Sequence, residues 1–211
     1  MKTQRKRKEK RIMNNKAMYK LTYGLFILTA RDGEKDNGCI VNTVTQVTTE
    51  PNRIAVAVNK QNYTHDMIVK TGVFNVSVLT ENSKFDTYKH WGFQSGRDVD
   101  KAEEITYQRA ENGVIYLAEE TNAYICAKVI SATDLGTHTL FLADVTDCEV
   151  LAEEESVTYS YYQKNIKTAP TDKKKGFICV VCGYVYEGDT LPDDFICPWC
   201  KHPASDFKPI S

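Results

Sequence analysis

The sequence predicts a mainly β protein made of two units, a large barrel followed by a small unit at the C-terminal end. The chain has 211 residues, which is more than one typical domain needs. Most of it consists of short apolar or alternating stretches separated by polar turns, with few helical stretches, and this pattern favours a barrel. Four of the seven cysteines lie in the last 33 residues, which marks a separate small unit.

Changes in composition divide the chain into four segments. Seven of residues 1–12 are Lys or Arg and almost none is apolar, so this segment is expected to be disordered. It is either an upstream extension of a reading frame that starts at Met13 or a functional basic arm. The barrel is expected over residues 13–166, a polar linker over 167–175 and the small unit over 176–211.

Alternating and apolar stretches predict the elements of the first unit. Strands are expected at 23–30, 39–49, 53–59, 73–79, 114–118, 123–130 and 139–150. Helices are expected at 63–71 and 81–91, with a closing helix at 156–166. The polar sequences between these elements predict turns at DGEKDNG (32–38), TTEPN (48–52), AENG (110–113) and TDLG (133–136).

The charge distribution excludes some functions. The formal net charge is -1, but residues 1–12 carry about +6, which leaves about -7 on the rest of the chain. An acidic body argues against a nucleic-acid-binding core. No apolar run approaches the roughly 20 residues that a membrane helix needs, and no apolar segment follows the basic start as it would in a signal peptide. A cytoplasmic protein without a membrane segment is therefore expected.

Two C-x-x-C pairs dominate the small unit. Cys179 and Cys182 form the first pair, and Cys197 and Cys200 form the second. Four thiolates arranged as a tetrahedron select zinc or iron. A unit of 36 residues is too small for a self-sufficient core, so the metal is expected to supply much of its folding free energy. The spacing alone leaves an iron site and a structural zinc ribbon equally open.

The residues around the cysteines favour iron. Pro198 lies inside the second pair, and the aromatic residues are Phe177, Tyr184, Tyr186, Phe195 and Phe207. The sequences CGYVYEGD, LPDDFICPWC and SDF resemble rubredoxins over the whole unit. This resemblance implies one iron ion held by the four cysteines. The chain departs from free-standing rubredoxins in a shorter interval between the pairs, and in Lys201 where the family usually has Gly.

Four stretches of the first unit resemble the flavin reductase family with its FMN-binding split barrel. They are YGLFILTA (23–30), NGCIVNTVTQVTTEPNRIAVAVNKQNYTHDMI (37–68), GRDVDK (96–101) and GTHTLFLADV (136–145). The last stretch departs from the commoner GDHTLFVGEV of the family. The resemblance implies a split β-barrel with a few helices that binds FMN in a groove at the interface of a homodimer.

The resemblance also implies two groups of flavin contacts. A strand rich in hydroxyl and amide groups is expected to lie against the flavin through Asn42, Thr43, Thr45, Gln46 and Thr48. The start of the next helix is expected to bind the phosphate through Asn59, Lys60, Asn62, Tyr63 and Thr64. The alternatives are a solvated strand face for the first group and ordinary helix capping for the second. No catalytic residue stands out.

The order of the two units resembles the high-molecular-weight rubredoxins of anaerobes. That resemblance implies an oxidoreductase that passes electrons from NAD(P)H through FMN to iron, and then to an acceptor such as a flavodiiron protein that reduces oxygen or nitric oxide. The alternative is a flavin and iron carrier that another protein reduces, without direct oxidation of NAD(P)H. A third possibility, from a different class, is a zinc-ribbon nucleic-acid protein. The choice between NADH and NADPH, and between transfer within one chain and across a dimer, stays open.

Overall fold

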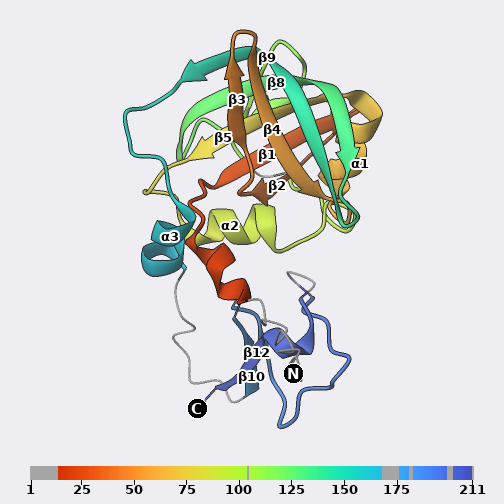
Figure 1. The fold of residues 1–211 in the computed structure, drawn as a ribbon, viewed down its shortest axis with the longest axis vertical. Helices are drawn as coiled ribbons and strands as arrows, with labels where there is room; N and C mark the ends of the chain where they lie inside the picture. Colours follow the sequence, from red (N-terminus) through yellow and green to blue (C-terminus); the bar gives the residue numbers. More distant parts are fainter. Residues whose placement is uncertain (1–13, 104, 168–175, 181–182, 199–201, 211) are drawn as a thin grey trace, which may run out of the picture.

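A computed structural model describes residues 14–103, 105–167, 176–180, 183–198 and 202–210. The first unit is built on one antiparallel sheet in the strand order β2-β1-β5-β8-β9-β4-β3, which curls round on itself (Figure 1). An apolar core fills the inside of this sheet. Its strands are β1 (Phe26–Asp32), β2 (Lys35–Val41), β3 (Thr45–Thr49), β4 (Asn52–Asn59), β5 (Val73–Leu79), β8 (Thr121–Asp134) and β9 (His138–Val150). The predicted mainly β barrel is confirmed.

Few helices accompany the sheet, as predicted. They are a 3₁₀ turn (Asn15–Lys20), α1 (Tyr63–Thr71), α2 (Phe85–Gly92) and α3 (Tyr159–Tyr161), which a π-helical turn (Tyr162–Ile166) continues. α1 ends at Gly72, whose φ of 69° gives the left-handed conformation that glycine adopts readily at helix ends. Among the described residues no helix has both the length and the apolar character of a membrane-spanning segment.

Two apolar clusters form the core of the first unit. The first fills the inside of the sheet, where α1 contributes Met67 and Ile68. The second joins α2 to the beginning and the end of the unit, because Tyr88 and Trp91 pack with Leu25 and Tyr162. The end of the unit also hydrogen-bonds to its start, since the Tyr159 amide donates to the Tyr23 carbonyl at 2.8 Å. Residues 156–166 are therefore part of the core.

The predicted turn over residues 32–38 is wrong. Gly33 has a φ of 60°, so a tight turn at Gly33 and Glu34 joins β1 directly to β2. β2 then begins at Lys35 and buries Asp36 and Asn37. The long strand predicted over 39–49 is accordingly divided between the end of β2 and β3.

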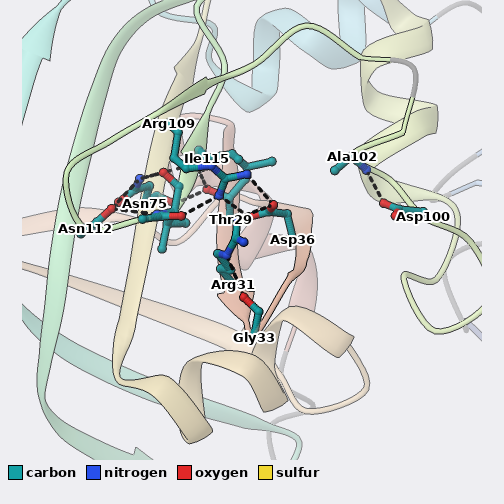
Figure 2. A network of polar contacts seen from close by, with 12 residues as sticks. Thr29, Arg31, Gly33, Asp36, Asn75, Asp100, Ala102, Arg109, Asn112 and Ile115 are labelled. Atoms are coloured by element: carbon teal, nitrogen blue, oxygen red, sulfur yellow. Dashed lines mark hydrogen bonds and ion pairs between the residues drawn. The ribbon is translucent and has the colours of Figure 1, made fainter.

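A polar network explains why a charged residue can lie inside this hairpin (Figure 2). The Asp36 carboxylate is 6% exposed and accepts hydrogen bonds from Arg31 at 3.2 Å and from Arg109 at 3.0 and 2.8 Å. Arg109 belongs to a small separate hairpin of β6 (Gln108–Arg109) and β7 (Ile115–Tyr116). Thr29 also donates to the Ile115 carbonyl at 2.6 Å. The network thus fixes the 108–116 hairpin against β1 and β2.

The second unit is a three-stranded antiparallel sheet in the order β11-β10-β12. Its strands are β10 (Gly176–Cys179), β11 (Val185–Tyr186) and β12 (Phe207–Ile210), with a 3₁₀ turn at Ala204–Asp206. Cys179, Cys197 and Phe207 are buried together, and the other predicted aromatic residues pack around them. The basic segment 1–12 and most of the predicted linker, 168–175, lie outside the described residues.

Candidate functional site

A cavity of about 920 Å³ lies where three segments of the first unit meet. This volume is in the range of ordinary small-molecule sites. The segments are the middle of β2 (residues 37–39), the connection from β4 into α1 (residues 59–64) and the loop after α2 (residues 92–101). Ile196 and Pro198 of the second unit complete the lining.

The N-terminus of α1 opens into this cavity. Asn62, the N-cap residue, lines the cavity and makes no side-chain capping hydrogen bond, and Tyr63 and Thr64 follow it in the lining. Backbone N–H groups and the helix dipole at such an end attract anions. The first turn also carries Asp66, whose carboxylate is paired with Arg97 at 2.5 Å and with His65 at 3.1 Å. Hydrogen bonds from these two residues hold the pKa of Asp66 below its usual value.

Asn37, in the cavity lining, carries a buried hydrogen-bond acceptor that has no partner among the described residues. Its side chain is 1% exposed, and its Nδ2 donates to Thr64 Oγ1 at 2.9 Å. Its Oδ1 is the one buried side-chain polar atom in the described part of the chain that lacks a partner. A side chain at position 96 would overlap this oxygen, so Gly96 allows the loop to pass close to it. The oxygen is covered by Gly96, so a bound molecule reaches it only if the 92–101 loop shifts.

Lys101 places a buried ammonium group in the cavity wall. The residue is 3% exposed, and Nζ donates to the carbonyls of Gly38 at 3.0 Å and Trp91 at 2.8 Å. Burial lowers the pKa of Lys101 to about 8. Cys39 lies nearby, and burial raises the pKa of its thiol. Lys101 therefore carries positive charge at neutral pH and loses it as the pH rises through 8.

Two more cations, Lys35 and Arg97, contact the ring of Tyr63, which lines the cavity. Lys35 Nζ and Arg97 Cζ lie 4.8 and 5.0 Å from the centre of the Tyr63 ring. Lys35 also donates to the Gly96 carbonyl at 2.9 Å. Together with the ion pair between Arg97 and Asp66, these contacts fasten the 92–101 loop to α1 and β2. The charged residues of the cavity lining are thus two cations, Arg97 and Lys101, and one anion, Asp98, and Arg97 is paired with Asp66.

The two predicted groups of flavin contacts lie in different places. Asn59, Asn62, Tyr63 and Thr64 line the cavity together. Lys60 does not line it, because its Nζ lies 2.7 Å from Asp134 in an ion pair across the protein surface.

The residues predicted from the polar strand lie away from the cavity lining. Thr43 exchanges hydrogen bonds with the backbone of Ala57, and Thr48 donates to the Pro51 carbonyl at 2.5 Å. The β3 residues, which include Thr45 and Gln46, are exposed along the edge of the sheet, and Asn42 is half-buried just before it. The contacts of this group with a flavin stay a prediction.

Asn37, Arg97 and Lys101 line the cavity but were not predicted as individual site residues. They lie in the stretches 37–68 and 96–101 that carry the resemblance, and that was the available signal.

The second unit brings one cysteine from each C-x-x-C pair into one buried cluster. Cys179 and Cys197 are both fully buried, and their amides donate to the carbonyls of Tyr184 and His202, each at 2.8 Å. Cys182 and Cys200 lie outside the described residues, and the rest of the described chain contains no group of three or more potential metal ligands. Two thiols buried side by side from both pairs fit the predicted tetrahedral site.

Comparisons with known proteins agree with this division. Residues 18–170 match the family described as "Flavin reductase like domain" and residues 177–208 match "Rubrerythrin, rubredoxin-like domain". The chain is 39% identical to the high molecular weight rubredoxin of Moorella thermoacetica, over 94% of this chain and all of that protein. It is 38% identical to a ferric-chelate reductase (NAD(P)H) of Archaeoglobus fulgidus, over 71% of this chain and 89% of that protein.

Solved structures show the same fold for the first unit. The NADH:FAD oxidoreductase SgcE6 of Streptomyces globisporus superposes with a TM-score of 0.63 at 21% identity, over 69% of this chain and 86% of that one. An FMN-binding protein of Thermus thermophilus superposes with a TM-score of 0.58 at 23% identity, over 62% of this chain and 73% of that one. At these identities the likeness concerns the fold of the barrel.

Proposed function

The chain belongs to the flavin reductase-like family and carries a rubredoxin-like domain at its C-terminal end, and from this premise we propose that it passes electrons from NAD(P)H through FMN to one iron ion. The matched families support flavin and iron as the two redox groups and electron transfer as the activity. Two similar proteins, a ferric-chelate reductase (NAD(P)H) and an NADH:FAD oxidoreductase, support a nicotinamide donor.

The observation that carries the proposal is the cavity of the first unit into which the start of α1 opens. FMN is an anion through its phosphate, and the start of α1 with Asn62, Tyr63 and Thr64 offers backbone donors where Lys101 and Arg97 add positive charge. Asn59 adds an amide group to the same wall.

The polar strand fits a site shared with a second copy of the chain. Because β3 is an exposed edge strand, its predicted contacts need a flavin that reaches beyond the cavity of its own subunit. This is the arrangement expected of a homodimer with FMN at the interface. Lys60, which is paired with Asp134, contacts the phosphate only if that surface ion pair opens.

The iron is held by Cys179, Cys182, Cys197 and Cys200 in the unit expected over residues 176–211. A reduced flavin can release two electrons one at a time, and a one-iron centre accepts one electron at a time. The protein supplies the position of each group, with residues 13–166 as the flavin unit and 167–175 as the linker. The proposed acceptor is a flavodiiron-type protein, and the proposed location is the cytoplasm.

The visible spectrum of the purified protein tests this function. The as-purified protein is expected to show flavin and iron–thiolate absorption together, and titration with NADH or NADPH under argon is expected to bleach both. A colourless second unit would identify zinc instead of iron. Bleaching by neither nicotinamide would mean that another protein delivers the electrons.

A further inference from the structure

Residues from both units meet at the mouth of the cavity. Ile196 and Pro198, which line it, are the two neighbours of Cys197 in the chain. Ile196 is 52% exposed, and an isolated β-bridge pairs it with Pro203. The second cysteine loop therefore reaches the cavity through the residues on either side of a buried thiol that we assign to the iron.

Phe93 makes a second connection between the units. It is the C-cap residue of α2 and lines the cavity, yet it also packs against the buried cluster of Cys179, Cys197 and Phe207. Its ring lies edge-on to Phe85 of α2, at 6.0 Å between centroids. A third contact comes from Lys167, whose Nζ donates to the Val180 carbonyl at 3.3 Å. The units thus share packing as well as a covalent linker.

The two cysteine loops differ in their relation to the cavity. Val180 follows Cys179 in the chain and is 46% exposed, like its counterparts in the second loop, but it does not line the cavity. Among the residues of the two loops that the structure describes, only those of the second loop therefore line the cavity.

We propose that Ile196 and Pro198, on either side of Cys197, dock on the cavity of their own chain, so that electrons pass from flavin to iron within one subunit across the edge formed by Phe93, Ile196 and Pro198. The inference rests on the proposed function, because it takes FMN as the occupant of the cavity. The rate of electron transfer falls steeply as the distance between two redox centres increases. At this contact the residues next to the Cys197 thiolate in the chain, Ile196 and Pro198, line the cavity itself. The short tether also keeps the local concentration of the iron unit high at the cavity.

The electrons balance in two one-electron steps. A hydride from NAD(P)H and one proton reduce FMN by two electrons. The reduced flavin then gives one electron to Fe(III), which becomes Fe(II) and passes the electron to the external one-electron acceptor of the proposed function. A second identical step returns the flavin to its oxidised form, and two protons leave it over the two steps.

Stopped-flow spectroscopy of the full-length protein with both cofactors tests the proposal through Ile196→Ser, with Val180→Ser as the matched control. Each variant removes one exposed apolar side chain next to one iron ligand. We expect Ile196→Ser to slow iron bleaching at least fivefold, relative to flavin bleaching in the same trace, and Val180→Ser to change it less than twofold. Equal effects of the two variants would overturn the docking site.

Hydrogen–deuterium exchange supplies a readout that does not depend on activity. Docking predicts faster exchange of the backbone amides of residues 93–99 in Ile196→Ser and in Phe93→Ser, but unchanged exchange in Val180→Ser. Unaltered exchange of this segment in Ile196→Ser and Phe93→Ser would overturn the contact. If NAD(P)H fails to bleach the flavin of the unaltered protein, the proposed function fails, while the exchange measurement still decides the docking.

Co-expression of two differently tagged full-length chains distinguishes transfer within a chain from transfer between chains. One chain carries Cys179→Ser and therefore lacks iron, and the other carries Thr64→Glu, which places a negative charge at the predicted phosphate site. The purified doubly tagged protein is expected to show no fast iron reduction by NAD(P)H. Fast iron reduction in it would show that electrons cross between subunits and would overturn the proposal.

Discussion

The two units of this chain bury their interiors in different ways. The first unit has two apolar clusters that include Trp91, Phe74 and Phe141, all fully or almost fully buried. In the described part of the second unit the buried cluster contains only Phe207 and two cysteines. This difference indicates that apolar burial supplies most of the folding free energy of the first unit. The folding of the second unit instead depends on the metal that its cysteines are expected to bind.

Removing a metal ligand should have the largest effect, and it should be confined to the second unit. Cys197→Ser is expected to abolish the iron–thiolate absorption and to unfold the small sheet, because metal binding supplies most of its folding free energy. FMN should remain bound. Visible absorption together with thermal unfolding followed by circular dichroism measures both outcomes. Loss of both cofactors at once would contradict the separation of the units.

The reverse experiment truncates the core of the first unit. Phe74 is fully buried, so Phe74→Ala is expected to lower the free energy of unfolding of the barrel by about 3–5 kcal/mol. The iron–thiolate spectrum should be unchanged at temperatures where the barrel is still folded. Denaturant unfolding followed by flavin fluorescence and by iron absorption separates the two units, and loss of the iron signal in parallel with the barrel would argue that they unfold together.

A polar change in the first unit should have an intermediate effect. Asp36→Asn keeps the shape of the side chain but removes the charge that pairs with Arg31 and Arg109, and we expect a loss of about 2–3 kcal/mol. The matched control is Asp32→Asn, which breaks an exposed ion pair with Lys70 and should cost less than about 1 kcal/mol. Urea unfolding measures both variants. Similar losses in the two would mean that the network in Figure 2 contributes no more than a surface pair.

The smallest expected effect concerns ligand binding and pH. Burial lowers the pKa of Lys101 to about 8, so its positive charge is present below pH 8 and is lost as the pH rises through 8. FMN affinity of the unaltered protein should therefore fall over that range. Lys101→Met is expected to weaken FMN at pH 7 by about 1.5 kcal/mol, roughly tenfold, and to remove the pH dependence. Fluorescence titration tests this, with the exposed Lys70→Met as control.

The sequence predicted local elements better than long-range burial. Helix 63–71 and strand 73–79 were predicted with the observed bounds, because their apolar periodicity and the intervening Gly72 are local signals. The 32–38 segment was misjudged because the partner that allows Asp36 to be buried, Arg109, lies 73 residues further along the chain. A polar sequence gives no sign of such a distant partner.

Only part of the candidate site could be predicted, again because contacts between distant segments leave no local signal in the sequence. The start of α1 was predicted as a phosphate site because it follows a strand and carries polar residues, and the structure places Asn62, Tyr63 and Thr64 in the cavity lining. Asn37 and Lys101 could not be identified individually, since their place in the cavity depends on the 92–101 loop folding back onto β2. The four cysteines were identified by spacing, and the structure places one from each pair in the same buried cluster.

The position of residues 156–166 has a consequence for how the protein is made. This segment is the last part of the first unit to leave the ribosome, yet Val157, Tyr162 and Ile166 complete a cluster that begins at Leu25. A nascent chain that ends before this segment exposes one side of that cluster to water and to other chains. The barrel therefore lacks part of its core until Ile166, just before the linker, has been added to the chain. Until residue 166 has emerged from the ribosome, the nascent barrel is therefore an aggregation-prone intermediate.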